Sequence, residues 1–562
     1  MIVKAFKKLQ TRGRWLVGLI SAIAAFGVGQ ATLHAQEITF FYSLLSLSMP
    51  VESLETFAET GEIDTSLNDF ARLINPTDEQ LEKFQTGLTA SANVDPVLLS
   101  RLLNTDEGER LLEILGSNFT VLGGRNAQIP LRGALVSAAF EPEGLSSLSF
   151  LRNLPVNMQI DVEQSLKRAR QVEYIVDATK TFSDKMFALA ATEADTLADP
   201  NYGALPNLAE PGPLATTHTT WNLVDTNRDD RKFYVEVHTP ATLPTGELPV
   251  IVISHGLNSR PEDFADVAEH LASNGFVVVM PQHPGSDTAQ GDALLKGTSR
   301  VLFRLDEFIN RPADISFTLD ELERRNQAEF GGRLNLERVG ALGHSFGGYT
   351  VLAIAGAKID FEHLQQDCDD KVGQLNTALY LQCRALKLER QDSDFRDERV
   401  TSVIAYNPVN ASIFGPKGLS NVEIPVLIGA GSYDPAAPFV FEQLRSFPWI
   451  SSPERYLLLR EGQTHVDISK LDAGISDAVR SVPNLTLPSP QLLKNYSSPV
   501  VIAFAKVYTA QDNDYGVYLE PDYLNYLSEG QEFKAALITE KSSDELQAAI
   551  DDYIRANRSR VE

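Results

Sequence analysis

The sequence predicts an α/β fold, in which a mostly parallel sheet carries helices on both faces and follows an all-α accessory domain. From Thr217 onward, apolar runs of strand length alternate with segments of helical periodicity. This alternation is typical of parallel strands joined by crossover helices. Before that point, apolar residues recur at helical spacing, as in residues 51–61 and 78–88, which predicts helices.

The strands of the α/β part are predicted from continuous apolar runs, because strands covered on both faces lack polar alternation. These runs, with an expected hairpin at the start, are residues 219–224, 232–238, 248–254, 276–281, 338–342, 400–406, 422–428 and 456–459. Helices are predicted over 261–274 and 301–325. Between them, residues 285–300 form a polar stretch that predicts a long loop.

The first 35 residues have the layout of a secretory signal peptide. A basic stretch ending at Arg14 is followed by the apolar run 15–28 and then by small residues. The alternative is a single membrane anchor, but the apolar run is short for a bilayer span. We therefore expect cleavage after Ala35 or Ala31, export to the periplasm or the exterior, and no stable membrane span in the mature chain.

The chain is too long for one ordinary domain, with 562 residues. Residues 199–213 are rich in proline and glycine, a composition typical of a linker. The predicted division is a signal peptide over 1–35, a helical accessory domain over 37–164, a helix and linker over 165–215, an α/β catalytic domain over 216–510 and a C-terminal helical extension over 511–562.

The charge of the chain excludes some partners. The formal net charge is −26, and it is more negative without the signal peptide, which is basic. Such a chain is repelled by nucleic acid and by anionic membrane surfaces. The two cysteines are Cys368 and Cys383. In an exported protein such a pair predicts a disulfide, and two cysteines alone do not make a zinc site.

The most informative motif is Gly-x-Ser-x-Gly over residues 343–347. It follows an apolar strand and precedes an apolar helix, which is the context of a nucleophile elbow. A serine on so tight a turn needs neighbours without a Cβ atom two residues away on each side. Ser345 is therefore the predicted nucleophile. The alternative is a glycine-rich turn with an idle serine.

A serine nucleophile needs a base, and the base needs an orienting acid. The order along the chain in α/β hydrolases is nucleophile, acid, histidine. His465 lies in a polar turn just after a predicted strand and is the predicted base, whereas the other later histidine, His363, lies in a charged insertion. Asp434 follows another strand and is the predicted acid. Its rivals are Asp467, Asp394 and Asp397.

The oxyanion of an acyl-transfer intermediate needs two backbone N–H donors. The predicted donors are Phe346, which follows the nucleophile, and Leu257, in the loop after residues 248–254. Gly256 permits a close approach of this loop, although an ordinary strand-end glycine is the alternative. His255 and His283 end two strands at the same edge and are expected to be structural.

These residues resemble the platelet-activating-factor-acetylhydrolase-like and dienelactone-hydrolase-like α/β hydrolases. The matching segments are 254–256, 311–315, 343–348, 432–434 and 464–467. Segments 48–61 and 131–139 are similar to secreted bacterial hydrolases that carry an N-terminal domain of unknown function. The resemblance implies a serine carboxylic-ester hydrolase, acting on phospholipid acetyl or short acyl esters. In the eukaryotic acetylhydrolases the acid follows the strand after the nucleophile helix, where this chain has Asn407 and no acid.

The sequence thus predicts an exported esterase or lipase-like enzyme acting on a small-molecule or lipid ester, with no metal and no organic cofactor. A serine peptidase on the same fold is one alternative, and a non-catalytic binding protein on a hydrolase scaffold is another. The connection 407–421 leaves little room for a lid. We therefore expect the N-terminal domain, or residues 285–300, to cover the pocket.

Overall fold

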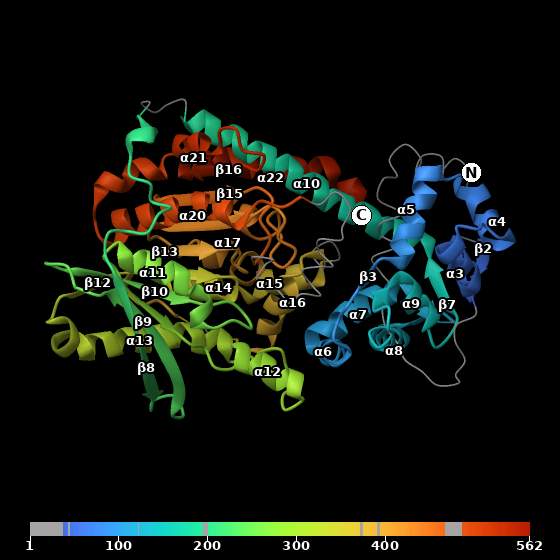
Figure 1. Ribbon diagram of the computed structural model, residues 1–562, viewed down its shortest axis with the longest axis horizontal. Coiled ribbons are helices and arrows are strands. Elements are labelled where there is room, and N and C mark those ends of the chain that lie inside the picture. Colours follow the sequence, from blue (N-terminus) through green and yellow to red (C-terminus); the bar gives the residue numbers. More distant parts are fainter. Residues whose placement is uncertain are drawn as a thin grey trace.

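The computed structural model describes residues 37–42, 45–121, 123–194, 200–370, 375–390, 394–466 and 486–561. The predicted signal peptide lies outside the described residues. A smaller N-terminal part, blue in Figure 1, lies at one end of the molecule. The long helix α10 (Val162–Ala194) runs from this part along the larger one.

The larger part is built on a nine-stranded sheet. Its strands are β8 (Thr216–Asp225), β9 (Arg231–Pro240), β10 (Leu248–Ser254), β11 (Val277–Pro281), β12 (Leu334–His344), β13 (Val400–Tyr406), β14 (Val426–Gly431), β15 (Arg455–Arg460) and β16 (Ala535–Thr539). Their spatial order is β16-β15-β14-β13-β12-β10-β11-β9-β8. The strands from β15 to β11 pair in parallel, whereas β8, β9 and β16 pair antiparallel. The predicted mostly parallel sheet is confirmed.

Helices cover both faces of this sheet, which explains the continuous apolar runs. On β10, Val250 and Val252 belong to one buried cluster, while Ile251 and Ile253 belong to the cluster on the opposite face. Successive side chains of a strand point to opposite faces, so both sets are buried. The covering helices are α11 (Ala265–Ser273), α13 (Glu307–Phe330), α14 (Phe346–Ile354), α20 (Pro490–Phe504), α21 (Pro521–Ser528) and α22 (Ser543–Val561).

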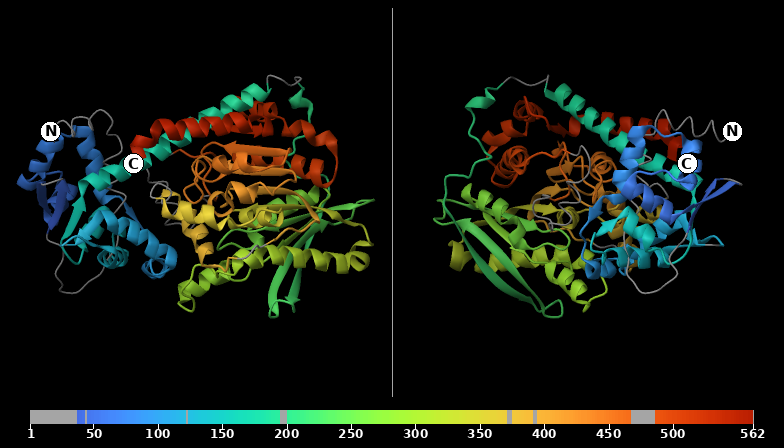
Figure 2. Two further views of the ribbon diagram at one scale, coloured as in Figure 1. Left: turned by 180° about the vertical axis from the view of Figure 1, so that it is seen from behind. Right: turned by 45° about the vertical axis from the view of Figure 1, so that its right-hand side comes forward.

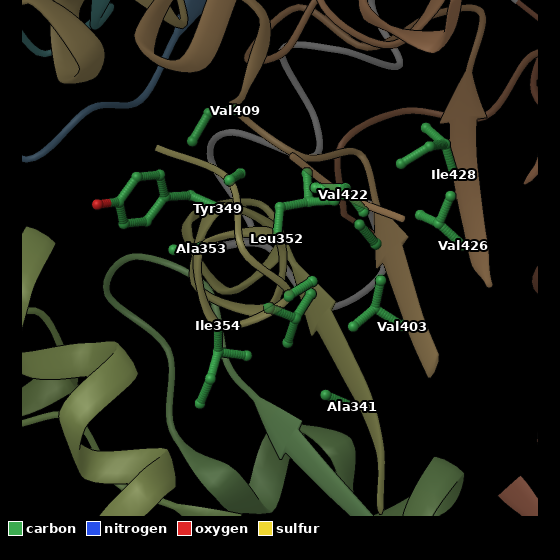
Figure 3. Close-up of a cluster of buried hydrophobic side chains, with 14 of the residues drawn as sticks. Ala341, Tyr349, Leu352, Ala353, Ile354, Val403, Val409, Val422, Val426 and Ile428 are labelled. Atoms are coloured by element: carbon green, nitrogen blue, oxygen red, sulfur yellow. The ribbon is translucent and has the colours of Figure 1, made fainter. Parts of the chain in front are cut away.

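Helix α14 packs against the middle of the sheet. Figure 3 shows Leu352 and Ile354 of this helix beside Ala341 of β12 and Val403 of β13. Every residue of α14 is buried. The helix therefore has little freedom to shift, and its first turn is held at the carboxyl edge of the sheet.

The expectation of an all-α accessory domain is wrong, because the N-terminal part contains a five-stranded sheet in the order β2-β1-β7-β4-β5. Its strands are only two to six residues long. Strand β1, at the start of the domain's sequence, pairs with β7, at its end. Runs this short show no periodicity that separates strand from helix.

The strands of the N-terminal part are β1 (Glu37–Tyr42), β2 (Leu45–Pro50), β4 (Phe119–Val121), β5 (Arg125–Asn126) and β7 (Met158–Asp161), and β3 (Ser91–Ala92) pairs with β6 (Leu145–Ser146). The helices are α3 (Val51–Thr60), α4 (Thr65–Ile74), α5 (Asp78–Thr89), α6 (Pro96–Leu102), α7 (Asp106–Asn118), α8 (Gln128–Ala138) and α9 (Ser147–Arg152).

Two further segments differ from expectation. The predicted loop over 285–300 contains helix α12 (Thr288–Lys296), whose N-cap is Asp287. The C-terminal extension, expected to be helical, contributes strand β16, which pairs with β15 at the sheet edge. A polar helix without an apolar stripe and a single edge strand both leave a weak pattern in the sequence.

The segment between α14 and β13 forms an insertion with its own anchor. It comprises α15 (Phe361–Asp369), α16 (Leu379–Gln382) and the 3-10 helix η4 (Cys383–Lys387), and it packs against α17 (Ala411–Leu419) and α18 (Gln443–Ser446). Fully buried Glu442 accepts hydrogen bonds from Asn376 (2.6 Å) and Gln382 (2.8 Å) of the insertion. Its other oxygen accepts from the N–H groups of Asn410 and Ala411. One buried carboxylate therefore joins the insertion to the start of α17.

The predicted disulfide is confirmed, since Cys368 and Cys383 are bonded with their Cα atoms 6.0 Å apart. The bond closes the insertion on itself and fixes the start of η4 against the end of α15. No helix in the described residues is both long and apolar enough to cross a bilayer.

Candidate active site

Ser345 lies on a sharp turn between β12 and α14. Its backbone has φ +57° and ψ −117°, a conformation that costs a residue with a Cβ atom free energy and that clusters at active sites. The N–H of Ser345 donates to the carbonyl of Tyr406 (2.9 Å), at the end of β13. The hydroxyl side chain is thereby held at the carboxyl edge of the sheet.

The two glycines of the motif are required by backbone contacts. A Cβ atom on Gly343 would collide with the carbonyl of Gly347, and one on Gly347 would collide with the carbonyl of Ser254. Neither neighbour can move as a side chain could. The turn therefore brings the start of α14 against the end of β10, for the steric reason that the sequence pattern indicated.

Asp434 and His465 are brought together from the loops after β14 and β15. The Nδ1–H of His465 donates to Oδ2 of Asp434 at 2.7 Å. The Asp434 side chain is fully buried, whereas that of His465 is 17% exposed. The second oxygen of Asp434 accepts from the N–H groups of Ala436 and Ala437, both at 2.8 Å. The carboxylate is held in place, and the Nε2 atom of the imidazole is left to accept a proton.

The histidine loop is attached to the serine turn by His344. The Nε2–H of His344 donates to the carbonyl of His465 (2.8 Å), and the two rings lie 4.7 Å apart. Burial lowers the pKa of His344 to about 3, so its ring is neutral. Asn407 donates to the same carbonyl at 3.3 Å. Asn407 stands where the acetylhydrolases carry their acid, and in this chain it holds the loop of His465 instead.

The loop after β10 passes close to the serine. A Cβ atom on Gly256 would lie 3.4 Å from the Cβ of Ser345. Leu257 follows directly, and the structure gives its N–H no acceptor among the residues it describes. Phe346 is the first residue of α14, and the first N–H groups of a helix have no partner within it. Both predicted donors are therefore at the same edge as Ser345.

A buried arginine fixes this loop to the nucleophile helix. Arg311 of α13 is fully buried and donates to the carbonyl of His255 and to the hydroxyl of Thr350 on α14 (3.0 Å). Its guanidinium lies 4.6 Å from the ring centre of Phe346. Burial lowers the pKa of Arg311 to about 10, so the group remains charged at neutral pH. One side chain thus touches both segments that carry the predicted oxyanion donors.

A second serine–histidine–aspartate array lies behind the site. Ser254 Oγ is 2.9 Å from Nε2 of His283, whose Nδ1 is 3.0 Å from Asp314. All three residues are fully buried, so no substrate reaches them. The N–H of His283 also donates to Nε2 of His255 (3.1 Å). These histidines have hydrogen-bonded structural positions, as expected.

The other candidate acids lie elsewhere or outside the described residues. Asp397 pairs with Arg399 (2.7 Å), and Asp394 is an exposed residue. Asp467 lies outside the described residues. The sequence reasoning missed the roles of His344, Asn407 and Arg311. Arg311 and His344 did occur in segments of the family resemblance, and Asn407 stood at the position of the missing acid, which were the signals available.

Two family models match different parts of the chain. A model described as an alpha/beta hydrolase of unknown function (DUF1400) matches residues 34–161, and the chlorophyllase model matches residues 212–366. The second match includes Ser345 and ends before Asp434 and His465. No curated protein matches the chain. Among the described residues, no group of three or more potential ligand side chains could hold a metal ion.

The substitution Gly347→Ala tests the backbone contact at the turn. We expect it to lower the free energy of unfolding by about 3 kcal/mol or more, because the added methyl group overlaps backbone carbonyls and the start of α14 must move away from β10. The measurement is urea unfolding followed by circular dichroism.

The matched control is Gly133→Ala in α8, where a Cβ atom would meet nothing within 4 Å. This change should stabilise the protein or leave it unaltered, since alanine favours a helix over glycine by about 1 kcal/mol. Equal stabilities of the two variants would contradict the steric argument.

Proposed function

We propose that this α/β hydrolase is a serine carboxylic-ester hydrolase that works through an acyl-enzyme. The observation that carries the proposal is the 2.7 Å hydrogen bond between Asp434 and His465, beside the turn that carries Ser345. The chlorophyllase model belongs to a carboxylesterase-type family, which supports an ester as the bond that is cleaved.

The proposed reaction follows from these positions. Ser345 Oγ attacks the ester carbonyl, and His465 Nε2 takes the hydroxyl proton. Asp434 stabilises the imidazolium through Nδ1. The N–H groups of Leu257 and Phe346 stabilise the negative oxygen of the tetrahedral intermediate. His465 then protonates the leaving alcohol, and water repeats the sequence to release the acid and restore the serine.

We also propose that the enzyme is exported and that it acts on a lipid or small-molecule ester. The Cys368–Cys383 disulfide supports export, because such bonds persist in oxidising compartments and are rare in the cytosol. The phospholipid acetyl or short acyl esters implied by the family resemblance are one substrate class for this proposal. A peptidase activity would use the same residues, and comparing an ester with its matching amide separates the two.

A fluorophosphonate probe tests the nucleophile. We expect it to label the wild-type protein, while Ser345→Ala should be unlabelled and should lose ester turnover by a factor of about 10⁴ or more. Ser254→Ala is the matched control, because Ser254 has similar partners but is fully buried. Its labelling should persist, with mass spectrometry placing the adduct on residue 345. A wild-type protein without any labelling would favour a binding protein on a hydrolase scaffold.

On the acid side, the pH dependence of kcat/KM should reflect the ionisation of a single group. As the pH falls, a proton on His465 removes the base and lowers kcat/KM. The neighbouring His344 has its pKa lowered to about 3 by burial, and burial also lowers the pKa values of His255 and His283 far below the ordinary value. These three rings therefore stay neutral over the acid side of the profile. The logarithm of kcat/KM should fall with a slope of one, and a slope of two would contradict this assignment.

Arg311→Lys tests the anchor of the oxyanion loop. Lysine keeps the charge but cannot reach His255, Thr350 and Ser286 together, as the guanidinium does. We expect kcat to fall by about tenfold to a hundredfold with little change in KM, since a small displacement of oxyanion donors acts on the transition state. Arg325→Lys is the control on the same helix, because Arg325 lies over Trp221 instead. A kcat equal to that of the control would disprove the anchoring role.

A further inference from the structure

A surface cavity of about 630 Å³, largely open to solvent, lies between the segment that leads into α13 and the 3-10 helix η4 of the insertion. Its apolar lining comes from Val301, Phe303, Leu305, Ile309 and Leu388. Sites for small molecules have volumes of roughly 300–1,000 Å³ and mostly apolar walls. Nothing in the proposed reaction so far uses this space.

The cavity wall is one aromatic ring away from the nucleophile turn. The ring of Phe303 lies 5.4 Å from that of Phe346, the residue after Ser345, in an edge-on contact. The next residue, Arg304, donates its N–H to the carbonyl of Gly285 (2.8 Å), in the loop after β11. The cavity is therefore at the same edge of the sheet as the site.

The three cationic residues around the cavity are already paired with carboxylates. Arg304 contacts Asp306 at 2.6 Å, Arg384 contacts Glu107 at 2.5 Å, and Lys387 contacts Asp106 at 2.5 Å. An anionic head group would have to compete with each of these carboxylates. The rest of the wall is apolar apart from exposed Glu389, which would repel an anion. An uncharged hydrocarbon chain is therefore the ligand that fits it.

We propose that this cavity binds the hydrocarbon chain of the substrate, so that the preferred substrates are esters with a long acyl or alkyl chain. The inference deepens the proposed function and rests on it. Each buried methylene contributes a factor of about four to binding. The enzyme would therefore discriminate by chain length.

The N-terminal part contacts one wall of the cavity from outside. Arg384 is only 8% exposed, and its guanidinium lies 4.9 Å from the ring centre of Phe303 while it pairs with Glu107 of α7. Arg110 of α7 donates to the carbonyl of Cys368 at 3.3 Å. A chain of contacts thus runs from Glu107 through Arg384 and Phe303 to Phe346. Figure 1 shows α7 on the side of the N-terminal part that faces the insertion. Figure 2 shows the N-terminal part from two further directions.

The first experiment fills the cavity with Leu388→Trp and compares p-nitrophenyl acetate, p-nitrophenyl dodecanoate and dodecyl acetate. The kcat/KM of at least one long ester should fall by about tenfold or more, since a filled pocket excludes the chain. The acetate should change by less than about twofold. The two long esters show whether the acyl or the alkyl chain enters. Ile554→Trp, at an exposed position of α22, is the control. Equal effects on short and long esters would overturn the proposal.

A binding measurement separates this proposal from the proposed function. Calorimetry with dodecan-1-ol and the Ser345→Ala variant requires no turnover. The dissociation constant should rise by about tenfold when Leu388→Trp is added. If the enzyme is active but Leu388→Trp leaves the dissociation constant of dodecanol unchanged, the proposed role of the cavity is wrong and the esterase proposal stands. If Leu388→Trp weakens dodecanol binding but the wild-type protein hydrolyses no ester, the cavity binds a hydrocarbon chain and the esterase proposal is wrong.

The role of the N-terminal part is tested by Glu107→Gln. Losing this charge should free Arg384 and raise KM for the long ester by about threefold to tenfold, without a change for the acetate. Glu109→Gln is the matched control, since Glu109 is on the same helix but pairs with Arg132 inside the N-terminal part (3.1 Å). The same KM for both variants would overturn the contribution of α7 to the wall.

Discussion

The contact between the start of α14 and the end of β10 is the constraint on which the site depends. At Gly347 the helix approaches the carbonyl of Ser254 so closely that no side chain fits between them. The approach leaves Ser345 with a strained backbone at positive φ. The burial of all of α14 supplies the free energy that keeps this conformation in place. A Cβ atom on Gly256 would lie 3.4 Å from the Cβ of Ser345, so the loop after β10 also passes close to the serine.

Buried charge makes that space rigid. Removing Arg311 from water costs several kcal/mol unless partners replace the lost hydration. Its partners are the carbonyl of His255 just after β10, the hydroxyl of Ser286 in the loop before α12 and the hydroxyl of Thr350 in α14. Asp314 and Glu307 of the same helix pair with Arg231, so the charges of the region balance. An ionic network of this kind is poorly suited to adding stability, but it admits only one arrangement of the segments that it joins.

The N-terminal part contributes to the larger domain through charge more than through apolar packing. Its helix α7 presents Asp106 and Glu107 to Arg384 and Lys387 of the insertion. The insertion is fixed internally by the disulfide and by Glu442. Arg384 therefore contacts both Glu107 of α7 and the ring of Phe303. The family model that matches this N-terminal part is described only as an alpha/beta hydrolase of unknown function.

The sequence by itself determined the parallel sheet, the serine turn and the disulfide, because long apolar runs, glycine spacing and a lone cysteine pair are local signals. It also indicated Asp434 and His465, which the fold places 2.7 Å apart. The tertiary structure alone decided the strands of the N-terminal part, helix α12, the places of His344, Asn407 and Arg311, and the cavity wall. The short strands and α12 leave too weak a periodicity to recognise. The partners of β7, Asn407 and Arg311 lie far away in the sequence, and contacts across such distances follow from packing, which no local pattern encodes.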